Sequence, residues 1–150
     1  METRFSLTNK TRVKIPVLPF STIKNDILGE KYSLSIAFVS QKQSQKINKE
    51  YRNKNKPTNI LSFPLSKDSG EIIMCPAIIK SETDKFGRNF GKLLGYLTIH
   101  GMLHLKGFEH SSTMERSEEK YDKKYFRRNR CGIHRYKSCS GRNFEGRKKS

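Results

Sequence analysis

Three of the chain's four histidines stand in one short run, His100-Gly-Met-Leu-His104-Leu-Lys-Gly107-Phe-Glu-His110. On an α-helix, residues four apart share a face, with Cβ atoms about 5–6 Å apart, so His100 and His104 can point to one place. Gly107 can end the helix in the left-handed conformation that other residues resist, after which the chain turns back and brings His110 to the same place. The pattern therefore predicts an open metal site of three imidazoles, with the fourth position left for water or substrate.

The alternative interpretation of this run is an ordinary core helix. Leu93, Leu97, His100 and His104 follow a spacing of three or four residues, so the two histidines also continue an apolar stripe. A hydrogen-bonded pair of core histidines fits that stripe, but it explains neither the third histidine nor the glycine at the turn. The complete pattern therefore favours the metal site.

The same histidine spacing occurs in metzincin proteases, which carry a glutamate directly after the first histidine as general base. Gly101 stands at that position here, and a glycine cannot accept a proton from water. The chain is therefore not expected to be a protease of this kind. Hydrolysis would have to rely on the metal, which lowers the pKa of a bound water, or on a base from elsewhere in the chain.

The chain is strongly basic. Its 150 residues, the length of one domain, include 31 Lys and Arg against 14 Asp and Glu, for a net charge of +17. This imbalance is typical of proteins with a polyanionic partner, above all nucleic acid, although a genome biased towards lysine codons also produces basic proteins. Residues 120–150 contain twelve of the basic residues and two acids, so we expect a folded domain, 1–125, and a mobile basic tail, 126–150.

The three cysteines, Cys75, Cys131 and Cys139, are odd in number and form no C-x-x-C motif. We therefore expect no disulfide partner and a reducing, cytoplasmic location. Cys131, His134 and Cys139 could in principle share a metal, but their spacing matches no common zinc module. The N-terminus lacks the apolar core of a secretory signal, and the most apolar stretch, 93–105, is too short to span a membrane.

Hydrophobic periods and turn residues predict a mixture of strands and helices. Strands are expected at 4–7, 32–39, 60–63 and 71–74, the last two as a hairpin, and helices at 20–28, 40–51, 76–85, 92–105 and 111–125. The two kinds of element do not alternate strictly. This order predicts an α+β fold in which a small mixed sheet is covered by helices, with the metal site at the C-terminal end of a central helix.

Some side chains can be assigned a role within these expected elements. Tyr51 and Phe63 are expected to pack in the core, with stacking on RNA bases as the alternative. Ser111 or Ser112 is expected to cap the last helix. Glu115, Glu118 and Glu119 lie near its start, where the helix dipole favours acidic side chains.

Three segments, His100–His110, 48–64 and 70–75, share their order and spacing with the motifs of one known family. They resemble H-G-x-L-H-L-x-G-[aromatic]-D-H, Y-R-x-x-x-x-P-T-D-V-L-S-F-P and G-D-I-x-I-C of the YbeY endoribonucleases. The resemblance extends over about residues 30–120. Two positions depart from the family pattern, because Glu109 and Asn59 each stand where the family usually has Asp.

The resemblance implies a metal-dependent, single-strand-specific endoribonuclease, a hydrolase of RNA phosphodiester bonds. It would act in rRNA maturation and ribosome quality control, with rRNA as substrate and the small ribosomal subunit as partner. His100, His104 and His110 would be the metal ligands, and the expected cofactor is one Zn²⁺ ion per chain. Arg52 matches the functional arginine of the family.

The basic residues around Arg52 suit an RNA substrate. Arg52 would hold a phosphate oxygen through a planar two-point contact and stabilise charge in the transition state. Lys54 and Lys56 would attract the RNA backbone. An arginine at a helix end is also favourable for the helix alone, so without the resemblance Arg52 would be taken for a surface residue.

Two other functions fit the same residues. One is a non-catalytic RNA-binding factor in ribosome biogenesis with a structural metal, which the missing base at Gly101 favours and the open three-ligand geometry disfavours. The other is a metal-dependent hydrolase of another ester or amide, against which Gly101 and the positive charge both weigh.

Overall fold

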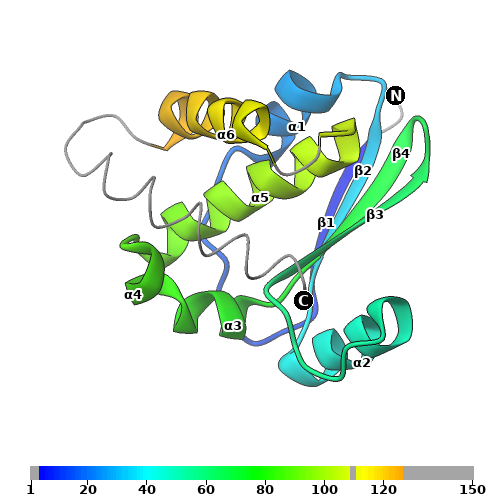
Figure 1. Cartoon of the computed structure of the whole chain (residues 1–150), viewed down its shortest axis with the longest axis vertical. Coiled ribbons are helices and arrows are strands. Elements are labelled where there is room, and N and C mark those ends of the chain that lie inside the picture. Colours follow the sequence, from blue (N-terminus) through cyan, green and yellow to red (C-terminus); the bar gives the residue numbers. More distant parts are fainter. Residues whose placement is uncertain (1–3, 109–110, 127–150) are drawn as a thin grey trace.

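The computed structural model describes residues 4–108 and 111–126 (Figure 1). Its strands are β1 (Phe5–Asn9), β2 (Ser33–Phe38), β3 (Ile60–Ser66) and β4 (Ser69–Met74). They form one sheet in the order β1-β2-β4-β3, in which β2 is parallel to both β1 and β4, and β3 is antiparallel to β4. The predicted mixed sheet and the predicted hairpin of the last two strands are confirmed.

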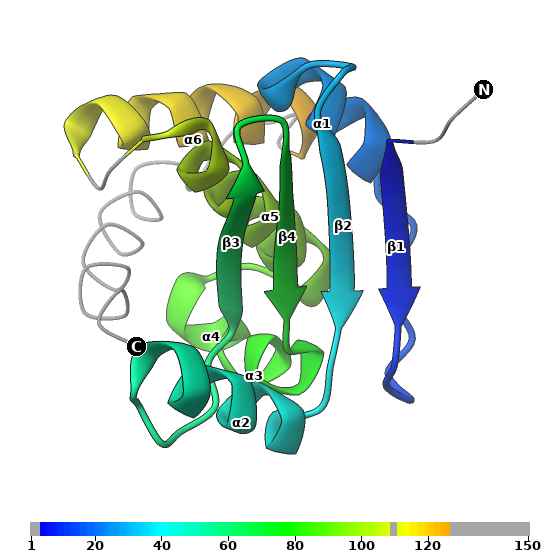
Figure 2. The ribbon, with the colours of Figure 1, turned by 90° about the vertical axis from the view of Figure 1, so that its right-hand side faces the viewer.

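The helices of the described residues are α1 (Phe20–Leu28), α2 (Gln41–Arg52), α3 (Pro76–Ser81), α4 (Thr83–Phe86), α5 (Phe90–Lys106) and α6 (Ser112–Tyr125). Figures 1 and 2 show α1, α5 and α6 on one face of the sheet, and α2 at the end of the sheet where β3 begins. The predicted α+β class is confirmed. None of the helices in this part of the chain is both long and apolar enough to cross a membrane.

One predicted helix is divided in two. The expected helix over 76–85 ends as α3 at Ser81 and resumes as α4 at Thr83. Between them the backbone N–H of Glu82 bonds the carbonyl of Ile79, three residues back, so the α-helical ladder of four-residue bonds stops there.

The core lies between the sheet and α5. Alternate residues of the two central strands point to the helices and are buried: Leu34, Ile36 and Phe38 in β2, and Ile72 and Met74 in β4. From Leu93 to Leu103 every residue of α5 is buried, which makes it the central helix of the fold. Each large apolar side chain buried in this way contributes roughly 1.5–3 kcal/mol to folding.

Local capping fixes both ends of α5 and the start of α6. The side-chain oxygen of Asn89 accepts a hydrogen bond from the Lys92 backbone at 2.9 Å, so α5 begins two residues before the expected start. Gly107 has a φ of 109° and ends α5, as predicted. The hydroxyl of Ser111 accepts from the Met114 backbone at 3.3 Å and starts α6, also as predicted.

Candidate metal centre

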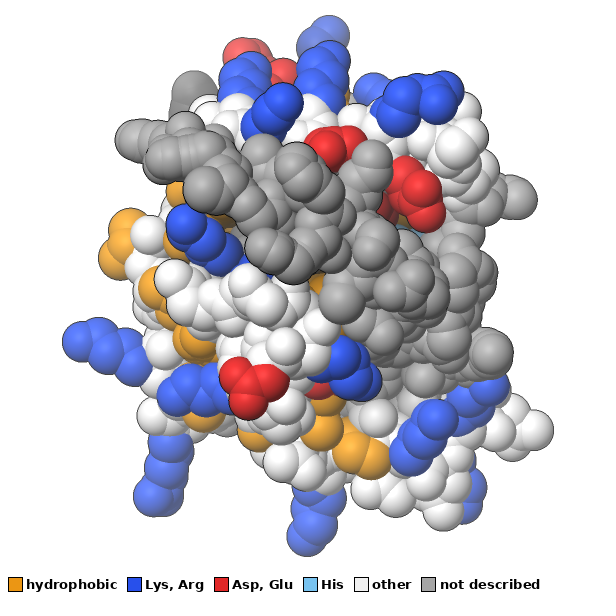
Figure 3. All heavy atoms as spheres, turned by 60° about the vertical axis from the view of Figure 1, so that its left-hand side comes forward, with side chains coloured by type: hydrophobic (Ala, Val, Ile, Leu, Met, Phe, Trp, Pro, Cys, Tyr) orange, Lys and Arg blue, Asp and Glu red, His pale blue; other side chains and the backbone are white. Residues whose placement is uncertain are grey.

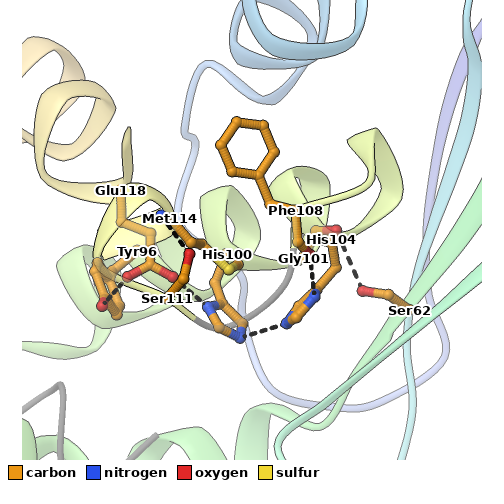
Figure 4. Close-up of polar contacts among 9 residues, drawn as sticks. All are labelled: Ser62, Tyr96, His100, Gly101, His104, Phe108, Ser111, Met114 and Glu118. Carbon is orange, nitrogen blue, oxygen red and sulfur yellow. Dashed lines mark hydrogen bonds and ion pairs between the residues drawn. The ribbon is translucent and has the colours of Figure 1, made fainter. Parts of the chain in front are cut away.

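His100 and His104 lie one turn apart on α5 and face each other (Figure 4). Their Nε2 atoms are 3.1 Å apart, and their rings are nearly perpendicular, with centroids 4.5 Å apart. His100 is buried and His104 is half-buried. The structure thus brings two of the three predicted ligands together at the C-terminal end of the central helix.

The second nitrogen of each ring faces an oxygen acceptor. His100 Nδ1 bonds the carboxylate of Glu118, and His104 Nδ1 lies 3.2 Å from the carbonyl oxygen of Phe108. A carbonyl oxygen or an ionised carboxylate can only accept, so this geometry suits the tautomer that carries the proton on Nδ1 of each ring. In the neutral rings both Nε2 atoms therefore keep a lone pair, and the two lone pairs point to one place.

This donor set fits a metal ion. Two lone pairs 3.1 Å apart repel each other unless a proton or a cation lies between them. Two Zn–N bonds of about 2.0–2.1 Å at the tetrahedral angle would separate the nitrogens by about 3.3 Å, close to the observed spacing. Among residues 4–108 and 111–126, however, no group of three His, Cys, Asp or Glu side chains is arranged to hold a metal.

Several predicted residues lie outside the described part of the chain. His110, the third predicted ligand, and Glu109 are among them, as are Cys131, His134 and Cys139 of the alternative metal site. Most of the basic tail, 127–150, lies there too. The third ligand and the tail therefore remain predictions.

Gly101 lies where α5 comes closest to β3. A Cβ atom on this glycine would stand 2.9 Å from the end of the Ile60 side chain and 3.0 Å from the Ser62 hydroxyl. That hydroxyl also donates to the Gly101 carbonyl at 3.3 Å. The position after the first histidine therefore faces the sheet, and a catalytic glutamate has no room there.

The predicted RNA-contacting residues lie at the end of α2 and in the loop that follows it. Arg52 ends α2 and is exposed, and Lys54 and Lys56 follow in the loop that leads into β3. The side chain of Asn48 donates to the Lys56 carbonyl at 2.9 Å, which holds this loop against α2. The structure therefore places Arg52, Lys54 and Lys56 together, ahead of the strand that touches α5 at Gly101.

Tyr51 does not lie in the core, so that prediction is wrong. Its side chain is 64% exposed and makes an edge-to-face contact with the half-buried ring of Phe63, with centroids 5.2 Å apart. The reason is the position of α2 at the end of the sheet, where the helix buries only Ser44 and Asn48. An aromatic ring is thus presented to solvent directly beside Arg52.

Asn59, which departs from the family pattern, is buried and has a defined partner. Its side-chain N–H donates to the Glu82 carboxylate at 2.9 Å. An ionised Asp could not donate this hydrogen bond and would repel Glu82. The asparagine at residue 59 is therefore explained by the Glu82 carboxylate, which accepts a hydrogen bond that an aspartate could not donate.

Sequence reasoning missed the two residues behind His100. Glu118 was expected near the start of the last helix, where the helix dipole favours acids, but it lies in the middle of α6, is 4% exposed and contacts His100. The hydroxyl of Tyr96 donates to its other carboxylate oxygen at 2.7 Å. A signal was present, because Met114, Glu118 and Asp122 are four residues apart and so share the buried face of α6.

The family model described as Endoribonuclease YbeY matches residues 8–128 of the chain. The chain belongs to the YbeY family. Its matched region contains the three motif segments and both facing histidines, so the resemblance seen in the sequence is confirmed. His100 and His104 therefore lie within the region that matches the family model.

Known YbeY proteins and a solved structure agree with this assignment. Endoribonuclease YbeY of Staphylococcus carnosus is 34% identical over 107 residues, which are 63% of this chain and 70% of the relative. The YbeY of Staphylococcus saprophyticus is 37% identical over 103 residues, 61% of this chain and 67% of the relative. The solution structure of TM1509 from Thermotoga maritima is similar with a TM-score of 0.57 and 25% identity, covering 79% of this chain and 87% of that one.

Proposed function

We propose that this protein is a metal-dependent endoribonuclease that cleaves single-stranded RNA in rRNA maturation and ribosome quality control. The observation that carries the proposal is the convergence of the His100 and His104 Nε2 atoms in a chain of the YbeY family. The similar proteins from the two Staphylococcus species are named endoribonucleases.

The metal would be one Zn²⁺ ion, held by His100, His104 and His110. Imidazole nitrogens are ligands that zinc accepts, and three protein ligands leave a fourth position for water or substrate. A bound zinc ion lowers the pKa of water to about 7, which makes hydroxide available at neutral pH. The chain's own contribution would be the two acceptors, the Glu118 carboxylate and the Phe108 carbonyl, which keep the proton of each ring on Nδ1 and leave the Nε2 lone pairs for the metal.

Arg52, Lys54 and Lys56 would bind the RNA backbone. Arg52 can grip a phosphate through two parallel hydrogen bonds, and the lysines add electrostatic attraction. The exposed ring of Tyr51 offers a stacking surface for an unpaired base next to them, which suits a single-stranded substrate. Figure 3 shows many Lys and Arg side chains and few acids around the visible surface, in keeping with the net charge of +17.

The partner would be the small ribosomal subunit, and the protein would act in the cytoplasm as a folded domain, 1–125, followed by a basic tail, 126–150. Phe126 still belongs to the described fold, because its ring lies against Gly95 of α5.

The buried, free thiol of Cys75, whose pKa is raised by burial, agrees with a reducing compartment.

Replacing one ligand tests the proposal. In His104→Ala we expect bound zinc to fall from one ion per chain towards zero and cleavage of single-stranded RNA to fall to background, because two imidazoles hold zinc poorly. Elemental analysis and a cleavage time course on single-stranded and duplex RNA measure both. His134→Ala, which removes the histidine of the alternative site with Cys131 and Cys139, distinguishes the two sites and should change neither quantity.

The alternative is a non-catalytic RNA-binding factor with a structural metal. It is favoured by Gly101, which faces the sheet and supplies no base. Metal-loaded wild-type protein that binds single-stranded RNA without cutting it would support this alternative. Full cleavage by metal-free His104→Ala would contradict the metal-dependent mechanism.

A further inference from the structure

A buried carboxylate connects α6 to the histidine pair. The Glu118 side chain is 6% exposed and reaches across from α6 to α5 (Figure 4). One of its oxygens accepts from His100 Nδ1, and the other accepts from the Tyr96 hydroxyl at 2.7 Å. A carboxylate out of contact with water is costly unless donors satisfy it, and here each oxygen has one.

The surrounding contacts fix where Glu118 can lie. One turn further along α6, Asp122 forms a two-point ion pair with Arg88, at 2.8 and 2.6 Å, in the segment that precedes α5. The Arg88 guanidinium also lies 4.8 Å from the centre of the Tyr96 ring. Because Arg88 touches both Asp122 and Tyr96, the same contacts that dock α6 on α5 also hold Tyr96, one of the two partners of Glu118, in place.

We propose that Glu118 is a positioning residue, which keeps the proton of His100 on Nδ1 and turns the Nε2 lone pair towards the metal position beside His104. The proposal rests on the proposed function, since it assumes that this pair binds the metal. A metal-ligating histidine commonly donates its second N–H to a carboxylate, and losing such a partner costs about 10- to 100-fold in metal affinity. Glu118 meets the geometric condition for that role from a different helix.

The proposal gives Glu118 a task that differs from helix packing. A purely structural carboxylate would need only a donor for each oxygen, and its loss would lower stability without lowering the zinc affinity of the folded protein. A positioning carboxylate selects one tautomer, because an ionised oxygen accepts a proton from Nδ1 but cannot donate one. The zinc affinity of a folded variant, measured together with the tautomer of His100, therefore separates the two roles.

The test is Glu118→Gln in the full chain. The glutamine can turn its NH₂ group to Nδ1, which moves the ring proton to Nε2 and removes the lone pair that the metal needs. We expect zinc affinity, measured by competition with a chromogenic chelator, to fall about 10- to 100-fold. In the metal-free protein, ¹⁵N–¹H correlation spectra of the histidine rings should show the Nδ1–H form of His100 in wild type and a shift towards Nε2–H in the variant.

Two further variants sharpen the result. Glu115→Gln removes the same charge from an exposed position on α6 and should leave affinity and tautomer unchanged. Tyr96→Phe removes only the hydroxyl that holds the far oxygen of Glu118, and it should weaken zinc binding less than Glu118→Gln does. Circular dichroism and thermal melting establish that each variant is folded.

A folded Glu118→Gln protein with wild-type zinc affinity and an unchanged His100 tautomer would overturn the proposal. If that variant does not fold, the wild-type spectrum decides, because an Nε2–H form of His100 in the metal-free protein also overturns it. Failure of the proposed function looks different. Wild-type protein that holds zinc but cuts no RNA leaves the role of Glu118 intact, and Nδ1–H selection remains measurable even if no zinc binds.

Discussion

At the scale of single residues, one glycine sets how closely α5 approaches the sheet. The Cβ of an alanine at 101 would meet Ile60, Ser62 and Ile72 side chains at 2.9 to 3.2 Å. We expect Gly101→Ala to lower the free energy of unfolding by about 1–3 kcal/mol, the usual cost of overpacking, as measured by urea denaturation. Gly101→Glu should cost more and should not produce a protease.

The control for this substitution lies on the same helix. A Cβ at Gly91 would meet its nearest neighbours at 3.7 Å, which is ordinary contact. Gly91→Ala should therefore leave the protein as stable or slightly more stable, because alanine favours the helix. Equal effects of the two substitutions would show that close packing is not the reason for the glycine at 101.

At the scale of elements, a buried ion pair fastens α6 to the start of α5. The side chains of Arg88 and Asp122 are 5% and 0% exposed. We expect Arg88→Met to cost about 3–5 kcal/mol of unfolding free energy, because it removes the two-point partner of a buried carboxylate. The double variant Arg88→Met/Asp122→Leu should recover most of that loss, since it leaves no unpaired charge at this contact. A double variant no more stable than Arg88→Met would contradict this account.

A second contact between elements joins α1 to the end of α6 and depends on pH. Hydrogen bonds from Lys124, at 2.7 Å, and from Tyr125, at 2.6 Å, hold the pKa of Asp26 below its ordinary value. A lowered carboxyl pKa stabilises the fold above the unfolded-state value of about 3.9, and that contribution is lost as the pH falls through the folded-state pKa.

Asp26→Asn should therefore melt a few degrees below wild type at neutral pH, since the contact is partly exposed and screened. The difference should shrink as the pH falls below about 4. Melting curves between neutral and acidic pH measure it. A difference that stayed constant down to the acid limit would mean that the ionised carboxylate is not what stabilises the contact.

At the scale of the whole molecule, the positive charge should make RNA binding depend on salt. Each phosphate contact with a single strand contributes about 0.7 to the slope of log affinity against log salt. Replacing Lys54 and Lys56 by Gln should therefore reduce the slope by about 1.4. The measurement uses the His104→Ala background, so that the RNA stays intact.

The matched control replaces two lysines at the other edge of the sheet. Lys10 and Lys14 are exposed and follow β1, the edge strand opposite β3. Lys10→Gln/Lys14→Gln removes the same total charge. If this variant lowers the salt slope as much as Lys54→Gln/Lys56→Gln does, the attraction is diffuse and the loop before β3 has no special role.

Across the whole chain, short-range signals were enough for much of the fold. The helix with the histidines, its end at Gly107, the cap at Ser111 and the hairpin of β3 and β4 all follow from interactions within a few residues. That His100 and His104 face each other also follows from the local sequence, because helical geometry alone places residues four apart on one side.

Only the tertiary structure decided the surroundings of that pair. Glu118 and Tyr96 meet His100 because α6 docks on α5, and Gly101 is constrained by strand residues about forty positions earlier in the chain. Tyr51 is exposed because α2 lies at the end of the sheet, which its own apolar ring does not reveal. The physical reason is the separation along the chain over which each interaction acts. Local hydrogen bonds and hydrophobic periodicity involve residues a few positions apart, whereas burial and the partners of buried groups depend on which distant elements pack together.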